Sequence, residues 1–165
     1  MFRSICGMLA AILLLAACSP VERPRLGPPA MRLRDIRTLG EAPVKGEAVR
    51  FAFAEITGTP GAMRYAMEDY LKQYAASRNL VIVAEDDPTA VYRVKGYLQA
   101  VGDTTGGLLI YTWDVSDAAG RKLHRFSGQL VTARTEADPW AAVTVTQIGD
   151  AARETIDGLA DWLRG

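Results

Sequence analysis

Hydrophobic and polar residues follow two different rhythms along this chain. In several segments between residues 49 and 132, apolar side chains occupy every second position, which is typical of β-strands that cover a core with one face. In residues 60–77 and 139–163 they recur at steps of three and four, which is typical of helices with one apolar side. The pattern therefore predicts a domain that combines strands with amphipathic helices.

Five segments have the composition of strands. Residues 80–84 form a continuous apolar run, which predicts a buried strand. In residues 92–100 apolar positions alternate with polar ones, which predicts a strand with one polar face. The remaining predicted strands are residues 49–56, 108–115 and 121–132.

Both predicted helices are preceded by a start signal. Thr59 precedes Pro60, so the threonine can cap the helix while the proline occupies its first position. Asp138 and Pro139 repeat this arrangement before the second helix. The element order is then β-α-β-β-β-β-α. This order predicts an α+β fold, with a single, mostly antiparallel sheet of about five strands and two amphipathic helices packed on one face.

The turn at residues 117–120 predicts how the last two strands pair. A four-residue turn that ends at Gly120 places Trp113 opposite His124 and Tyr111 opposite Phe126. All of these rings would then share one face of the sheet, where cross-strand aromatic pairs are stabilising.

The strand that contains Trp113 is apolar on both faces, and this bears on function. Tyr111 and Trp113 point to one face, whereas Leu108 and Ile110 point to the other. If helices cover only one face, the other exposes apolar surface, which usually marks a partner site. The alternative is that these residues are simply core. With Tyr97 added, Tyr111 and Trp113 form the candidate partner or ligand surface, because their rings can stack on a ligand.

The first 17 residues have the features of an export signal. Arg3 is followed by an uncharged stretch, and residues 8–17 are apolar. About 10 apolar residues are too few to span a membrane, which requires roughly 20. The charge, the length and the small residues at the end are those of a secretory signal peptide. An N-terminal membrane anchor with a chance cysteine is the alternative.

The residues Leu15, Ala16, Ala17 and Cys18 resemble the lipobox of bacterial lipoproteins, and they lie at the correct end of the apolar run. The resemblance implies cleavage after Ala17, diacylglycerol on the sulfur of Cys18, and a second acyl group such as palmitate on the new amino terminus. Ser19 rather than aspartate follows the cysteine. In a Gram-negative bacterium, this implies an outer-membrane lipoprotein that faces the periplasm.

Residues 18–46 are predicted to be the acylated cysteine with an extended tether, and residues 47–165 the globular domain. Five of the eight prolines fall in the tether, which disfavours helix and sheet there. Arginines lie between these prolines. They could contact anionic headgroups, or the segment could be a solvated linker.

Charge and cysteine content exclude several functional classes. The 19 basic side chains balance 19 acidic ones, so nothing attracts the chain to nucleic acid over long range. Cys6 lies in the signal peptide and Cys18 is the acylated residue, so the mature chain has no cysteine left for a disulfide or a metal site. We expect no metal and no cofactor beyond the covalent lipid.

Three features that could carry chemistry have simpler interpretations. His124 is the only histidine, and Ser127 points to the opposite face of the same strand, so a catalytic triad is not indicated. The acidic residues 85–87 lack the spacing of a calcium loop and predict a solvated turn. The glycine-rich residues 102–107 lack the lysine of a phosphate loop and predict a hairpin. We therefore expect a protein that is not an enzyme.

The layout of lipobox, tether and small helix-and-sheet domain is similar to that of the LptE and LpoB types of envelope lipoprotein. This resemblance implies a non-catalytic outer-membrane lipoprotein, an accessory or scaffold that binds a protein or glycan assembly of the cell envelope. The alternative is a module that binds a small ligand, a lipid or a polysaccharide. A hydrolase with His124 as its base is the third hypothesis. The sequence does not predict an oligomeric state.

Overall fold

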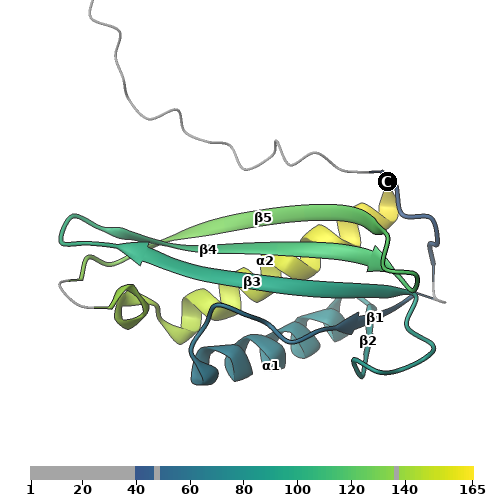
Figure 1. The fold of residues 1–165 in the computed structure, drawn as a ribbon, viewed down its shortest axis with the longest axis horizontal. Helices are drawn as coiled ribbons and strands as arrows, with labels where there is room; N and C mark the ends of the chain where they lie inside the picture. The colour runs from purple at the N-terminus through teal and green to yellow at the C-terminus, as the bar shows by residue number, and fades with distance from the viewer. Residues whose placement is uncertain (1–39, 47–48, 136–137) are drawn as a thin grey trace, which may run out of the picture. The chain divides into compact units, whose positions relative to one another are not determined.

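The computed structural model describes residues 40–46, 49–135 and 138–165 (Figure 1). The predicted signal peptide 1–17, Cys18 and most of the predicted tether lie outside the described residues. The predicted element order is confirmed, with a short 3₁₀ helix added before the last helix. In chain order the elements are β1 (Arg50–Phe53), α1 (Gly61–Ser77), β2 (Val81–Val83), β3 (Tyr92–Gly102), β4 (Gly107–Asp117), β5 (Lys122–Thr132), η1 (Pro139–Ala142) and α2 (Val145–Arg164).

The five strands form one mixed sheet in the order β2-β1-β3-β4-β5. The long strands β3, β4 and β5 are antiparallel neighbours, as predicted. The short strand β1 runs parallel to both β2 and β3. A parallel pair needs a crossover connection, and α1 supplies it between β1 and β2. The fold is therefore α+β, with a parallel edge on an otherwise antiparallel sheet.

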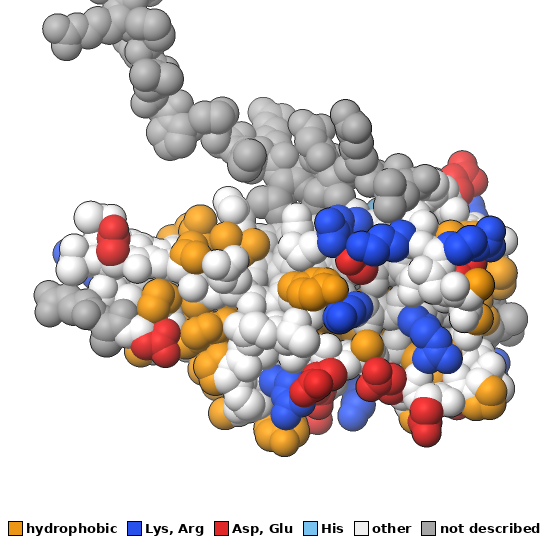
Figure 2. Space-filling model, in the orientation of Figure 1, with side chains coloured by type: hydrophobic (Ala, Val, Ile, Leu, Met, Phe, Trp, Pro, Cys, Tyr) orange, Lys and Arg blue, Asp and Glu red, His pale blue; other side chains and the backbone are white. Residues whose placement is uncertain are grey.

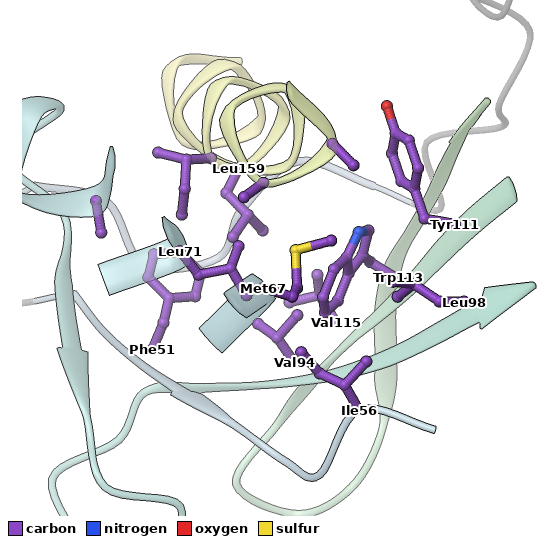
Figure 3. Packing of buried hydrophobic residues seen from close by; sticks show 14 of the residues in the cluster. Phe51, Ile56, Met67, Leu71, Val94, Leu98, Tyr111, Trp113, Val115 and Leu159 are labelled. Atoms are coloured by element: carbon purple, nitrogen blue, oxygen red, sulfur yellow. The ribbon is translucent and has the colours of Figure 1, made fainter. Parts of the chain in front are cut away.

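Both helices lie on the same face of the sheet, behind it in the view of Figure 1. Because side chains alternate along a strand, every second residue of the sheet points into the layer beneath the helices. Figure 3 shows side chains from the sheet and both helices gathered in this layer. Among them, Trp113 of β4, Met67 of α1 and Leu159 of α2 are fully buried. The predicted placement of the helices is confirmed.

The segment that leads into β1 is attached to this core by side-chain hydrogen bonds. The indole nitrogen of Trp162, near the end of α2, donates to the carbonyl oxygen of Gly40 at 2.8 Å. The hydroxyl of Tyr92 accepts from the amide of Val44 at 2.7 Å and donates to the carbonyl of the same residue at 2.8 Å. The rings of Tyr92 and Trp162 are in edge contact, with centroids 5.0 Å apart. These contacts hold residues 40–44 against the core.

The start of α1 differs from the prediction. Pro60 is the N-cap residue, with an extended ψ of 147°, and the helix begins at Gly61. The extended backbone keeps the proline out of the first turn. Thr59 does not cap the helix, because its hydroxyl donates to the carbonyl of Pro60 instead.

The start of α2 also differs from the prediction. Asp138 caps the short helix η1, where its carboxylate accepts from the amide of Trp140 at 3.0 Å. The long helix has its own capping box. The hydroxyl of Thr144 accepts from the amide of Gln147, and the Gln147 side chain accepts from the amide of Thr144. Two separate caps therefore replace the single predicted start.

The apolar run at residues 80–84 is a strand, but the prediction that it is buried is wrong. β2 has three residues and lies at the edge of the sheet, where it pairs only with β1. Val81 is 42% exposed as a result.

The predicted pairing of β4 with β5 is wrong by two residues. Trp113 pairs with Phe126, and Tyr111 pairs with Gly128. The predicted turn is one residue too long, since Asp117 bonds to Arg121, and a bulge then leaves Leu123 without a paired residue. A shift of two residues keeps every side chain on its predicted face, because strand side chains alternate with a period of two.

Candidate functional site

The face of the sheet turned away from the helices is the candidate site, and we call it the open face. It carries the outward side chains of β3, β4 and β5, because their inward neighbours are in the core. Figure 2 views this face and shows basic side chains gathered toward one end and apolar ones toward the other. The outward residues are Arg93, Lys95, Tyr97, Gln99 and Val101 from β3, Leu108, Ile110, Thr112, Asp114 and Ser116 from β4, and Lys122, Arg125, Ser127, Gln129 and Val131 from β5.

One carboxylate organises the basic end of the open face. The side chain of Asp114 is only 8% exposed, and it accepts hydrogen bonds from Arg125 at 2.5 and 2.8 Å and from Lys122 at 2.9 Å. Burial opposes ionisation of Asp114, but the bonds from Arg125 and Lys122 outweigh it and hold the pKa of this carboxyl below its ordinary value. The same contact raises the pKa of Arg125. Both cations are bonded to Asp114 at their charged ends, while more than half of each side chain stays exposed.

Tyr97 lies at the centre of the open face and is 38% exposed. The ammonium group of Lys95 lies 5.4 Å from the centroid of its ring, within the range of a cation–π contact. Beside the ring is a shallow groove of about 330 Å³, whose floor and walls include Gln99, Ile110 and Thr112. The groove therefore combines an aromatic ring, an aliphatic side chain, an amide and a hydroxyl.

The other end of the open face is apolar. Leu108 pairs with Val131 across β4 and β5, and it also pairs with Val101 across β3 and β4. Val131 is 78% exposed. Exposed apolar side chains that adjoin one another are more informative than isolated ones, because they mark contact surfaces.

The structure separates the three predicted surface residues. Tyr97 is on the open face, but Tyr111 and Trp113 point beneath the helices and are 2% and 0% exposed. Of the two alternatives left open by the sequence, core is therefore the correct one for this pair. Each ring lies over a glycine of the neighbouring strand, Tyr111 over Gly128 and Trp113 over Gly96. The predicted surface of three aromatic residues does not form.

Tyr111 ends in a polar contact at the rim of the core. Its hydroxyl donates to the carboxylate of Glu154 on α2. Burial, this hydrogen bond and the adjacent negative charge all raise the pKa of Tyr111 far above its ordinary value. The phenol is therefore neutral and serves to join β4 to α2.

His124 occupies a ring stack at the end of the helical layer. Its ring lies parallel to that of Trp162, with centroids 5.1 Å apart, and also stacks on Phe126 at 5.5 Å. It is 7% exposed, and burial lowers its pKa. Within the described part of the chain its Nδ1 atom has no hydrogen-bond partner. Ser127 lies on the opposite face of β5, as the sequence predicts.

The remaining sequence candidates lie in turns. The carboxylate of Asp87 accepts from the amide and the hydroxyl of Thr89, which lowers its pKa. Asp103 makes the same pair of bonds with Thr105 in the hairpin between β3 and β4. Among the residues that the structure describes, no group of side chains is arranged to hold a metal ion, and no helix is both long and apolar enough to cross a bilayer.

A second concavity of about 440 Å³ lies at the carboxyl ends of β1 and β2, against α1. Glu55 and Arg64 form an ion pair at its rim, with 2.6 Å between Oε1 and Nη1. The carboxyl ends of parallel strands are a common position for ligand sites. Here the side chains that reach the opening are of both signs and include Glu68, Lys72 and Glu85. No single ligand charge is favoured.

The sequence analysis does not predict the basic cluster around Asp114. The sequence does indicate the part of it on β3, since Arg93, Lys95 and Tyr97 alternate with apolar residues and so share one face. Their proximity to Lys122 and Arg125 depends on the pairing of three strands, which the alternation does not reveal.

The sequence matches no known family model and no curated protein. The fold is similar to a crystal structure of a dodecamer of a PelC variant from Paraburkholderia phytofirmans, with a TM-score of 0.51 and 14% identity over 73% of this chain and 95% of that chain. A second PelC dodecamer from the same organism gives 0.51 and 13%, over 73% and 94%. At this identity the similarity shows the fold alone.

Proposed function

We propose that this protein is a non-catalytic lipoprotein of the outer membrane that faces the periplasm. It acts as an accessory or scaffold, and it binds a protein or glycan assembly of the cell envelope through the open face. The observation that carries the proposal is the asymmetry of the sheet. Both helices cover one face, and the other presents Tyr97, a groove and an exposed apolar end.

The location rests on the sequence around Cys18. Leu15 to Cys18 resemble a lipobox, and Ser19 follows the cysteine. Two or more acyl chains hold a protein stably on a bilayer, whereas one chain does not. Replacement of Cys18 by alanine should leave the precursor uncleaved or release a soluble form. A C18A variant that still fractionates with the outer membrane would contradict the anchoring part of the proposal.

Binding through the open face can be tested by photo-crosslinking in intact cells. A photoreactive amino acid at position 110 lies in the groove, whereas one at position 65 lies on the outer side of α1, where Tyr65 is 60% exposed. We expect a discrete envelope component crosslinked from position 110 and none from position 65. Equal crosslinking from both positions would show that the open face is not the binding surface.

Self-association is a second way to occupy an exposed surface, and the similar PelC structures are dodecamers. We therefore propose that this chain also assembles with copies of itself. Light scattering of the detergent-solubilised, full-length protein measures the mass directly. A monomeric mass at micromolar concentration would contradict this part of the proposal. The envelope partner would then be the component that covers the open face.

A further inference from the structure

The basic end of the open face and the groove beside Tyr97 are continuous, and together they have the chemistry of a sugar site. A tyrosine ring that is partly exposed offers a flat apolar surface with a polar tip. The C–H face of a pyranose ring can lie on such a surface. Gln99 and Thr112 beside it supply an amide and a hydroxyl, which are partners for sugar hydroxyl groups.

The charge next to this ring is positive. The open face carries four outward cations, Arg93, Lys95, Lys122 and Arg125, and one central carboxylate, Asp114. Lys122 and Arg125 bond to Asp114, whereas the guanidinium of Arg93 donates to the carbonyl of Glu85. The carboxylate is nearly buried and already bonded to two of the cations, so it holds them in place and offers little of its surface to a ligand. An anionic ligand meets the exposed parts of these side chains at the site.

The cations come from the two strands that flank β4. Lys95 and Arg125 are both paired with Asp114, one from each neighbouring strand. Two strand spacings therefore separate their backbones, which amounts to about 10 Å. The guanidinium of Arg125 reaches back over β4 to Asp114, so the distance between the backbones is not the distance between the charged groups. The cations nevertheless come from both sides of β4, and a chain that carries one charge on each of several successive units can contact more than one of them.

We propose that the open face binds an acidic polysaccharide, a chain of sugars that bear carboxylate groups. One sugar ring lies on Tyr97 in the groove, and the carboxylates of neighbouring units contact Lys95, Lys122 and Arg125. This inference rests on the proposed function, because it names the chemical class of the assembly that the open face binds. In this proposal the basic end of the open face binds the carboxylates of the polysaccharide, and the groove binds its sugar rings.

The test is a calorimetric titration of the full-length protein in detergent. The probes are a hexamer of galacturonic acid and a neutral hexamer of glucose of equal length. We expect binding of the acidic hexamer, weaker binding at high salt because exposed charges are screened, and at least tenfold weaker binding of the neutral hexamer. Equal affinity for the two hexamers, or no binding of the acidic one, would overturn the inference.

The chain contains a matched control for the pair formed by Tyr97 and Lys95. Tyr65 on α1 is also an exposed tyrosine with a cation over its ring, the guanidinium of Arg64 at 4.9 Å. We expect Y97A and K95Q each to weaken binding of the acidic hexamer about tenfold. Y65A and K72Q remove the same groups from α1 and should leave binding unchanged. If all four variants weaken binding equally, the attraction is non-specific and the inference fails.

Crosslinking and calorimetry together distinguish a failure of this inference from a failure of the proposed function. Crosslinking from position 110 to an envelope protein, together with no binding of the acidic hexamer, would exclude the polysaccharide while leaving an open face that binds a partner. Crosslinking from neither position and no calorimetric signal would remove both. Circular dichroism of each variant confirms that lost binding does not reflect lost folding.

Discussion

The two faces of the long strands are built on opposite principles. Beneath the helices, rigid aromatic rings lie over glycines, and a Cβ atom added at Gly96 would come within 2.3 Å of the ring of Trp113. On the open face, the charged ends of Lys122 and Arg125 are bonded to Asp114, and more than half of each side chain remains exposed. On the covered face, the space available to each side chain therefore decides which residues fit. On the open face, the side chains differ in charge and shape at the surface, and the core does not depend on them. Substitutions on the open face can therefore alter binding without altering the fold.

The sharpest test of this comparison uses two neighbouring leucines of β4. Leu109 is fully buried, whereas Leu108 points to the open face. L109A should lower the free energy of unfolding by about 2–5 kcal/mol, since it removes packed methyl groups and leaves a cavity. L108A should cost less than about 1 kcal/mol. Urea denaturation measures both values, and equal losses would show that the two faces contribute alike.

Glycine positions beneath the rings provide the next largest effect. A Cβ atom at Gly128 would lie 1.9 Å from the hydroxyl oxygen of Tyr111, so G128A forces the ring or the strand to move. We expect a loss of about 1–3 kcal/mol from overpacking. G61A is the matched control, because a Cβ there meets nothing within 4 Å. If G128A is as stable as G61A, the close fit of the covered face does not contribute to stability.

The charged cluster on the open face should matter less to folding than a buried leucine. D114N removes the carboxylate but leaves Lys122 and Arg125 with access to water. We expect a loss of about 1 kcal/mol or less in thermal or urea denaturation, and a smaller loss at high salt. A loss comparable with that of L109A would show that the cluster is structural rather than a surface for binding.

The smallest expected effect is the change of stability with pH, and it differs between His124 on the covered face and Asp114 on the open face. Burial lowers the pKa of His124, so the unfolded chain takes up a proton near pH 6.5 before the folded chain does. Stability is therefore complete above pH 6.5 and falls as the pH is lowered through that value. The carboxylates with lowered pKa, such as Asp114, lose their contribution only below their ordinary value of 3.8.

Urea midpoints between pH 8 and pH 5 measure this dependence. Replacement of His124 by phenylalanine keeps the ring stack with Trp162 and removes the proton. The H124F variant should show a flatter profile across this range. A wild-type stability that does not change between pH 8 and pH 5 would contradict the assignment.

Most of the fold was predictable from periodicity, because each long element has at least one apolar face. The pairing of β4 with β5 was not, since Leu123 is an inserted residue that no composition rule identifies. The exposure of β2 was also not predictable. An apolar run of three to five residues has the same composition at an edge as in the centre of a sheet.

The candidate site was predictable in part. Tyr97 lies between polar neighbours on its face of β3, so its outward position follows from alternation. Tyr111 and Trp113 could not be placed in this way, because β4 is apolar on both faces. The contact of Asp114 with Lys122 and Arg125 is tertiary, and it required the register that the bulge alters.

The contacts of Gly40 and Val44 have a mechanical consequence. Tension applied along the chain ahead of Gly40 reaches the indole of Trp162 and the phenol of Tyr92 before it reaches β1. Both rings pack against other aromatic rings of the core. The applied force is therefore distributed over side chains from the sheet and α2 together. β1, which lies between β2 and β3, would then be shielded when the domain is pulled from its amino-terminal side.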